Sequence, residues 1–558
     1  MSISFSAIGQ SINHDYSPAP NTISKGKILF QNNCASCHNF KQQGIGPNLS
    51  GVTAQVSYEW LNRFIRNSSE MIAAGDERAA RLIAQYKTPM PAHQQLKDSE
   101  IEAILAYIHQ QKSPVAGQQI DAVFGTPLKD VIPAKIEFSN LTLELESWAV
   151  APKTSNQNPF ARINKMVVLN GARKRVFIED IRGPLYEIQD KTFHTVMDLS
   201  KLVKGFINAP GLGTGFGSYA FHPGFSKNGL FYTTHTEKAG AAPADFKYAD
   251  SIPVALQWVI TEWKIDLAKS DSIFNGQPRE FMRINMVSSM HGVQEITFNP
   301  LAKPGSADYG LLYIGVGDGG SAEGGFAQLC NSSKTIWSSV LRINPLGRNS
   351  TNGKYGIAGN NAWAVDKDKK SLGEVFARGF RNPNRITWSP DGKMLISDIG
   401  LNNVEELNIG KNGADYGWPS REGTFALNYK GKMNLVYPLP ADDKGYNYPV
   451  IQYDHGEGNA FSAGFVYTGD IAELKNKYIF GDIVQGKVFY VDAKSLVPGK
   501  QSAIKEFALN FNGVPSNFKQ ITKNGKADLR IGAGIDGQLF LYTKTDGKLW
   551  LIKDCLKK

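Results

Sequence analysis

The chain carries two kinds of hydrophobic pattern, which change near residue 112. Before that point apolar positions recur at helical spacing. One such helix, which begins near Ser99, has an apolar face made of Ile101, Ile104, Leu105 and Ile108. From about residue 135 short apolar runs alternate with turns, as is typical of β-strands. We therefore predict a small all-α domain followed by an all-β domain.

Proline, glycine and polar positions set the expected domain boundaries. We expect a flexible N-terminal segment at residues 1–20, the helical domain at 21–112, a linker at 113–134 and the β-domain at 135–558. The linker prediction rests on prolines and glycines with little apolar periodicity between them. The first helix of the helical domain is expected near Ser24, whose hydroxyl is a suitable helix cap.

A repeat runs through the β-domain. Each copy contains an apolar strand, a turn, a second strand that ends in small or acidic residues, and a third strand. The copies are Met166–Ile188, Tyr219–Asp266, Ile296–Asn344, Ile386–Ile409, Gly464–Asp492 and Leu529–Ile552. Repeats of about 70 residues favour a six-bladed β-propeller with four-stranded blades. The spacing alone also suits seven blades or a sandwich.

Composition and charge narrow the function classes. No apolar run is long enough for a membrane-spanning helix. The 61 Lys and Arg exceed the 51 Asp and Glu by ten, but the excess is spread along the chain. This favours a basic soluble protein, with an anionic ligand or acidic redox partner as the alternative. No motif supports a nucleic-acid role. Besides the first two cysteines the chain has Cys330 and Cys555, for which we expect unpaired thiols rather than a disulfide.

The most informative motif is Cys34-Ala35-Ser36-Cys37-His38. C-x-x-C-H is the attachment signature of c-type haem: two thiols one helical turn apart bind the haem vinyl groups, and the adjacent His ligates the iron. A thioredoxin-like site would need a βαβ pattern, and a zinc site would need a second pair of ligands, both of which are missing. We predict haem c bound through Cys34 and Cys37, with His38 as an iron ligand.

The second axial ligand is expected downstream of His38. Met71, Met90 and His93 are the alternatives, and we favour Met90, which lies in the extended segment Thr88-Pro89-Met90-Pro91 before the last helix. The order of helix, haem motif, Gly-Pro loop, Met-Pro segment and final helix resembles a class I cytochrome c. A His/Met iron has a raised potential, so we expect this haem to accept electrons.

Four segments of the β-domain resemble the soluble quinoprotein glucose/sorbosone dehydrogenase superfamily. They are Gly217–Phe225, His291–Gly320, Phe376–Gly417 and Asp528–Ile552. The fusion to a cytochrome c resembles sorbosone-dehydrogenase-like fusions. The resemblance implies a six-bladed propeller that binds pyrroloquinoline quinone (PQQ) and calcium (Ca2+) at the mouth of its channel.

The resemblance also implies roles for individual residues. His291 matches the general base that takes the substrate hydroxyl proton, and no orienting partner for it is identified next to it in sequence, where Met290 stands. Asp454-His455 provides a reserve base. Arg381 and Asn382 match the PQQ-contacting Arg-Asn-Pro motif, and Arg530 resembles a second cofactor-binding arginine.

Two further features follow from the family pattern. The backbone carbonyls of Gly400 and Leu401 are expected to hold the cofactor's calcium. Two positions depart from the family: a cofactor lysine falls at Val484, and a glutamine falls at Gly213 or Thr214. These departures argue against glucose itself as the substrate.

The resulting prediction is a periplasmic, PQQ-dependent dehydrogenase. It oxidises a sugar, polyol or other alcohol and passes electrons from the quinol to the fused haem c, and then to a downstream cytochrome or oxidase. Haem c is attached outside the cytoplasm, so we expect that the secretion signal is absent from this sequence. The alternative is an electron-transfer cytochrome whose propeller is a non-catalytic binding module.

Overall fold

The computed structural model describes residues 14–35, 38–40, 46–86, 90, 92–94, 96–111, 123–171, 173–211, 213–268, 274, 276–365 and 370–557. The contacts between residues divide the chain into two compact units. The first comprises residues 1–123 with the short segments 323–325 and 430–434, and the second comprises the rest. Cys37 and most of the expected linker lie outside the described residues.

The first unit is helical. Its helices are α1 (Pro20–Asn33), η1 (Val52–Ala54), α2 (Tyr58–Ala73), α3 (Glu77–Tyr86) and α4 (Asp98–His109). The predicted apolar face of α4 is confirmed, because all four of its members are buried. The predicted start of the first helix at Ser24 is wrong: α1 begins at Pro20, where the missing N–H of proline leaves no helical hydrogen bond unmade.

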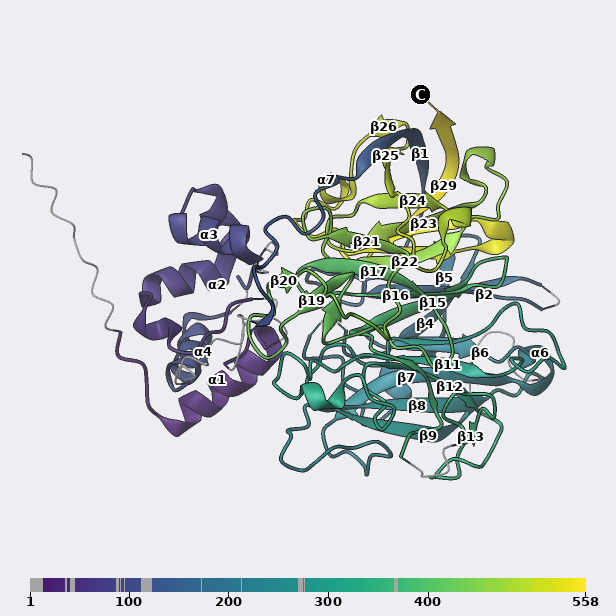
Figure 1. Cartoon of the computed structure of the whole chain (residues 1–558), viewed down its shortest axis with the longest axis horizontal. Coiled ribbons are helices and arrows are strands. Elements are labelled where there is room, and N and C mark those ends of the chain that lie inside the picture. Colours follow the sequence, from purple (N-terminus) through teal and green to yellow (C-terminus); the bar gives the residue numbers. More distant parts are fainter. Residues whose placement is uncertain are drawn as a thin grey trace, which may run out of the picture. The chain divides into compact units, whose positions relative to one another are not determined.

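Helices α1 and α4 pack against each other at Gly26 (Figure 1). A Cβ atom at this position would lie 1.8 Å from the carbonyl oxygen of Ala103 on α4. Only glycine allows the two backbones to approach this closely.

Part of the segment that we expected to be flexible is packed. Tyr16 is 7% exposed and belongs to the core of the helical unit. Its ring lies 4.8 Å from that of His109, and the ring of His14 stacks on Tyr58 at 4.1 Å. Within the segment 1–20, Tyr16 and His14 are therefore packed against the helical unit.

The second unit is built of mainly antiparallel sheets (Figure 1). Its first sheet has β2 (Ile163–Leu169), β3 (Arg175–Asp180), β4 (Pro184–Gln189) and β5 (Thr192–Asp198). The next has β6 (Ser218–Phe221), β7 (Leu230–Lys238), β8 (Leu256–Lys264) and β9 (Gln277–Met286). The third has β10 (Glu295–Phe298), β11 (Leu312–Val316), β12 (Ser339–Asn344), β13 (Gly356–Ile357) and β14 (Val375–Arg378).

The remaining strands follow the same plan. The fourth sheet has β15 (Pro383–Trp388), β16 (Met394–Asp398), β17 (Val404–Ile409) and β21 (Ile451–Asp454). A long sheet has β22 (Phe461–Val466), β23 (Lys477–Asp482), β24 (Val488–Asp492), β25 (Lys505–Phe511), β1 (Glu137–Val150), β29 (Lys548–Lys557), β28 (Leu539–Thr543) and β27 (Leu529–Ala533), with β26 (Val514–Pro515) at β25. A small sheet contains β18 (Arg421–Glu422), β19 (Phe425–Leu427) and β20 (Val436–Tyr437). Short helices α5 (Leu199–Leu202), α6 (Phe225–Asn228) and α7 (Phe518–Thr522) lie between strands.

The first strands of the successive sheets form a closed ring. Within the described part of the chain, β2 contacts β6, β6 contacts β10, β10 contacts β15, β15 contacts β22, β22 contacts β27, and β27 contacts β2. Each predicted repeat copy matches one inner strand and the two strands after it. The predicted repeat is thus confirmed, and the inner strands begin on a common side, where loops can converge on one site.

Strand β1 was not foreseen as part of the repeat. It pairs antiparallel with β29 and parallel with β25, so that Leu143 lies opposite both Cys555 and Leu509. The start of this unit therefore completes the sheet that its last strands build.

Two further observations bear on the sequence predictions. No helix of the described residues has both the length and the apolar character needed to cross a bilayer. Cys330 and Cys555 are buried and not joined by a disulfide, as expected. Burial raises the pKa of each thiol to about 12.

Candidate functional site

The helical unit encloses a cavity of about 350 Å³. Three of the predicted haem residues, Cys34, His38 and Met90, line it, together with apolar side chains from α2, α3 and α4. Cys37 lies outside the described residues. A mostly apolar cavity that brings a cysteine, an imidazole and a thioether together fits haem c.

His38 is oriented by the Gly-Pro loop that the sequence placed after the haem motif. Its Nδ1 donates to the carbonyl of Pro47 at 3.0 Å, which leaves Nε2 as the nitrogen that can ligate a metal. A Cβ at Gly46 would lie 2.5 Å from the imidazole, so glycine is needed there. Burial lowers the pKa of His38, and the bond to Pro47 opposes this effect only in part. The imidazole is therefore held in the neutral form that binds metals.

The alternatives for the second axial ligand differ in position. Met90 lines the cavity, and its backbone carbonyl accepts a hydrogen bond of 2.7 Å from the hydroxyl of Ser68, which is fully buried. Met71 is 3% exposed in the last turn of α2, and among the described residues neither it nor His93 lines the cavity. This arrangement favours Met90 as the ligand.

In the second unit His291 lies four residues before β10, at the start of an inner strand. It adopts the left-handed conformation, with φ of +46°, which is uncommon outside glycine and recurs at functional sites. The neighbouring Gly292 packs against the indole of Trp258, where a Cβ would lie 1.8 Å from the indole nitrogen. This close approach fixes the backbone that carries His291.

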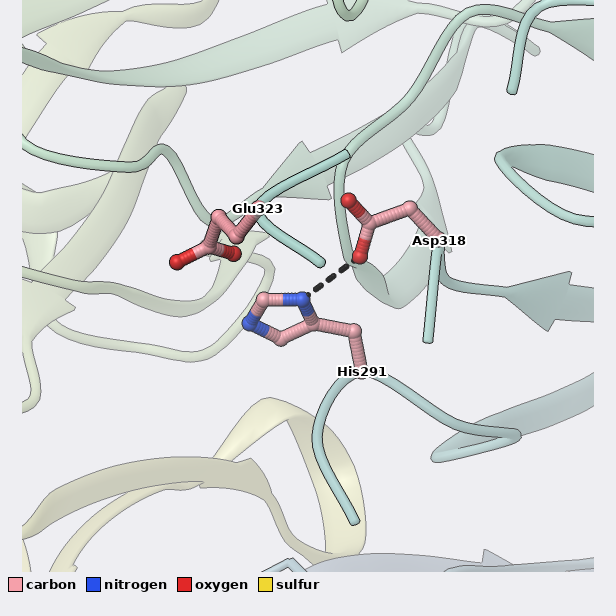
Figure 2. A group of neighbouring side chains, drawn as sticks. All are labelled: His291, Asp318 and Glu323. Carbon is pink, nitrogen blue, oxygen red and sulfur yellow. Dashed lines mark hydrogen bonds and ion pairs between the residues drawn. The ribbon is translucent and has the colours of Figure 1, made fainter. Parts of the chain in front are cut away.

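Asp318 is the partner of His291 that the sequence did not reveal (Figure 2). The imidazole Nδ1 lies 2.7 Å from Oδ1 of this fully buried carboxylate. The carboxylate also accepts N–H bonds from the backbone of Gly320 at 2.8 Å and from the indole of Trp418 at 3.1 Å. With Nδ1 directed at Asp318, Nε2 points to the opposite side of the ring, as Figure 2 shows.

The electrostatics of Asp318 match this arrangement. Burial by itself raises the pKa of the carboxyl group, but the charge and hydrogen bond of His291, the nearby Arg381 and the Gly320 amide lower it overall. The group is therefore an ionised carboxylate at neutral pH, and it can stabilise a protonated imidazole. An Asp–His pair of this kind is suited to general-base chemistry at Nε2.

Arg381, the predicted PQQ-contacting arginine, lies next to this pair and bonds to the backbone of two loops. Its backbone carbonyl accepts the amide N–H of Asp318 at 2.9 Å. Its guanidinium donates to the carbonyls of Ile399, at 3.2 Å, and of Gly400. Its amide and that of Asn382 donate to the carboxylate of Asp398. In this geometry Arg381 joins the Asp318 loop to the loop after β16.

The same contacts do not fit the predicted calcium site. The Gly400 carbonyl faces a permanent cation, the Arg381 guanidinium, which would repel a metal ion there. The amide of Leu401, at 2.8 Å, and the three amides after it donate to one oxygen of Glu422.

Arg530 lies in β27, beside β2. Its Nε donates to the side-chain oxygen of Asn164 at 3.1 Å, and its Nη1 lies 3.6 Å from Asp528. Arg385, which flanks the Arg-Asn-Pro motif, donates to the carbonyls of Asn164 and Gln294 at 2.9 and 3.0 Å. The two arginines thus connect the inner strands of three sheets inside the ring.

The two departures from the family pattern have different surroundings. A Cβ at Gly213 would lie 2.2 Å from the side-chain nitrogen of Gln294, which donates to the Gly213 carbonyl at 3.2 Å. A glutamine from the segment after His291 therefore occupies the space beside Gly213. Val484 bonds through its backbone: its carbonyl accepts the amide of Ala527 at 3.0 Å, and its amide donates to Asp482 at 3.0 Å.

His455, the reserve base, is enclosed. It is 8% exposed, and its Nε2 lies 3.0 Å from the buried carboxylate of Glu405, which also accepts the amide of Phe461 at 2.7 Å. Burial lowers the pKa of His455, but the bond and charge of Glu405 raise it overall. The Glu405 carboxylate thus joins the His455 imidazole to the backbone at the start of β22.

Comparisons with known proteins identify both units. The Glucose / Sorbosone dehydrogenase family model matches residues 165–551, and the Cytochrome c family model matches residues 23–112. The HIPL1 protein of Arabidopsis thaliana is 24% identical over 304 residues, covering 47% of this chain and 42% of that protein. Quinoprotein glucose dehydrogenase B of Acinetobacter calcoaceticus is 24% identical over 248 residues, or 41% of each chain. The chain thus spans about two fifths of the length of these curated relatives.

Solved structures support the fold. The soluble aldose sugar dehydrogenase of Escherichia coli, in its apo form, aligns with a TM-score of 0.50 and 16% identity, over 75% of this chain and 100% of that one. A glucose dehydrogenase crystal structure aligns with a TM-score of 0.50 and 17% identity, over 72% and 99%. Together with the closed ring of sheets, this likeness gives the second unit the propeller fold of those enzymes. The chain belongs to the Glucose / Sorbosone dehydrogenase family, with a cytochrome c domain in front of its dehydrogenase domain.

Proposed function

We propose that the protein is a PQQ-dependent dehydrogenase that oxidises a sugar, polyol or other alcohol and passes the electrons to its own haem c. The His291–Asp318 pair carries this proposal, because it places a general base at the start of an inner strand of a dehydrogenase-family domain. PQQ, when bound, would supply the two-electron oxidant that no side chain can provide. A haem on the same chain would be an acceptor at high effective concentration.

The chain's own residues would divide the work as follows. His291 takes the substrate hydroxyl proton at Nε2, and Asp318 holds the ring and stabilises its positive charge. Arg381 and Asn382 fix the loops beside this pair. Arg530, buried and bound to a neutral amide, supplies positive charge for a PQQ carboxylate. Haem c is bound through Cys34 and Cys37, with His38 and Met90 on the iron.

Three finer points belong to the same proposal. We count six blades, with the long sheet as two blades joined by the pairing of β1 with β25. We place the protein in the periplasm, because haem c is attached outside the cytoplasm, with a downstream cytochrome or oxidase as the final acceptor. Calcium at Gly400 and Leu401 is not part of the proposal, since the loop does not fit it.

Reconstitution tests the proposed function. Quinone-free holo-cytochrome is mixed with PQQ and a panel of aldoses, polyols and simple alcohols, with and without calcium, and haem reduction is followed by its absorbance. We expect reduction only when PQQ and a substrate are both present. If no compound reduces the haem with PQQ present, although dithionite does, the alternative is favoured: a cytochrome whose propeller is a binding module.

A further inference from the structure

One backbone position recurs at the mouth of the ring, directly after the second strand of a sheet. Ile181 follows β3, Ile483 follows β23, and Lys544 follows β28. In each case the amide N–H donates to the residue at the start of its own inner strand, and the carbonyl accepts an amide from the next inner strand. The donor distances are 3.1 Å to Arg162, 2.8 Å to Ala460 and 3.2 Å to Asp528.

The side chain at this position is apolar in two of these sheets and charged in the third. Ile181 is 1% exposed and Ile483 is 5% exposed, while Lys544 is 4% exposed. A buried ammonium group is costly unless an anion or several hydrogen-bond acceptors compensate it. Lys544 therefore stands where the sheets of β2 and β22 place an isoleucine, at a cost in stability.

The carboxylate that precedes this position in the other two sheets, and that could neutralise a lysine there, is missing before Lys544. Asp180 and Asp482 precede the two isoleucines and accept amide bonds from their inner strands. Thr543 precedes Lys544, and its hydroxyl is directed at Asp546. Among the described residues, the Lys544 ammonium forms no hydrogen bond and no ion pair.

The charges around Lys544 are mostly positive. The groups that act on it most strongly are Arg530, Arg162 and Lys526, against the single carboxylate of Asp528. Burial and these three cations lower the pKa of Lys544 well below its usual value, and Asp528 opposes them only in part. The Asp528 carboxylate already forms ion pairs with Arg530 at 3.6 Å and with Lys526 at 3.8 Å. Four cations around one carboxylate leave an excess of positive charge that an anionic ligand would neutralise.

We propose that Lys544 is a binding residue for a carboxylate of the quinone cofactor, beside Arg530. This inference rests on the proposed function, since PQQ is the tricarboxylate that the site would take. It also accounts for Val484, the apolar residue where the family pattern has a cofactor lysine. The backbone carbonyl of Val484 accepts the amide of Ala527, the neighbour of Asp528. The backbone amide of Lys544 donates to the carbonyl of Asp528 itself. A lysine from the sheet of β27, β28 and β29 thus supplies the cation that position 484 lacks.

Two measurements on the full-length cytochrome-containing protein test this role. PQQ binding to the quinone-free protein is measured by equilibrium dialysis, and the stability of the quinone-free protein is measured by urea unfolding. Lys544→Met keeps the length of the side chain and removes its charge, and Lys544→Arg keeps the charge. Lys553→Met, at an exposed position of β29, is the matched control.

We expect Lys544→Met to weaken PQQ binding about ten- to hundredfold, as the loss of a charged hydrogen bond should. The same variant should be at least as stable as the wild type without PQQ, because it removes an uncompensated buried charge. Lys544→Arg should retain most of the affinity, and Lys553→Met should change neither quantity.

The failures of the two proposals are distinguishable. If the wild type binds PQQ and Lys544→Met binds it equally well, the role of Lys544 is refuted and the proposed function stands. If Lys544→Met is strongly destabilised without PQQ, the lysine is structural and its binding role is overturned. If the wild type does not bind PQQ at all, the proposed function fails, and the role of Lys544 fails with it.

Discussion

Replacing Asp318 by Asn is the sharpest test of the site. The carboxylate of Asp318 accepts three N–H donors: His291 and the Gly320 amide at Oδ1, and the Trp418 indole at Oδ2. Asparagine has the same shape but only one acceptor oxygen. Its NH2 group must therefore face an N–H donor on one side, whichever way the amide is turned.

The expected magnitude follows from these contacts. A hydrogen bond to a charged group contributes about 1.5–3 kcal/mol, which corresponds to about a ten- to 150-fold change in rate if it acts in the transition state. The negative charge that would stabilise protonated His291 is lost as well. We therefore expect Asp318→Asn to lower kcat for haem reduction by about ten- to several hundredfold, with PQQ binding nearly unchanged.

The assay is the rate of haem reduction after reconstitution with PQQ, with His455→Gln as the matched control at the enclosed imidazole. The rate of haem reduction by His291→Gln should be about 10²–10⁴-fold lower than that of the wild type, which is the usual contribution of a general base. If Asp318→Asn reduces haem at the wild-type rate while His291→Gln does not, the pairing has no catalytic role. If His455→Gln is the inactive variant, His291 is not the base.

Asp318 also gives the folded protein a predictable pH dependence. Because its pKa is lowered in the folded state, its contribution to stability is fully present above the ordinary Asp pKa of about 4. That contribution is lost as the pH falls through the folded pKa. Urea unfolding between pH 6 and pH 3 should therefore show a smaller acid loss of stability for Asp318→Asn than for the wild type. An equal loss in both proteins would contradict the pairing.

Three further predictions concern the rest of the molecule. Met90→Ala should remove the sulfur–iron absorption band of the oxidised haem while the haem stays attached, and Met71→Ala should keep the band; the reverse result would make Met71 the ligand. Gly26→Ala should destabilise the cytochrome unit by several kcal/mol in thermal unfolding, because the new methyl group collides with the backbone of α4; an unchanged melting temperature would refute the close crossing. Cys330 and Cys555 should react with a thiol reagent at pH 8 only after unfolding, since both are buried with raised pKa values; rapid labelling of the native protein would show that they are accessible.

The sequence predicted those features that depend on local pattern. The haem residues and the apolar face of α4 follow from residue spacing within one segment. The inner strands recur at intervals that can be recognised in the sequence. His291 was found because it lies in a recognisable segment before an inner strand. These predictions required no knowledge of which segments meet in space.

The features that were missed depend on contacts between distant segments. Asp318 lies 27 residues after His291, in a glycine-rich turn that gave no reason to single out its carboxylate. The contacts of Arg381 with the loop after β16 were missed for the same reason, because its guanidinium reaches the carbonyls of a later segment. Lys544 becomes conspicuous only when its backbone bonds show that it shares a position with isoleucines.

The position of β1 has a consequence for how the protein is made. Strand β1 is synthesised roughly 400 residues before its partner β29, and such distant pairings form slowly. The cytochrome domain matched at residues 23–112 precedes β1 and is synthesised long before this partner, so covalent haem attachment need not wait for the propeller. A chain that ends before β29 would leave β1 and β28 each with an open edge, which is a template for aggregation. Once the last strand β29 is made, it covers both edges within the same chain; until then, these edges can pair with strands of other chains.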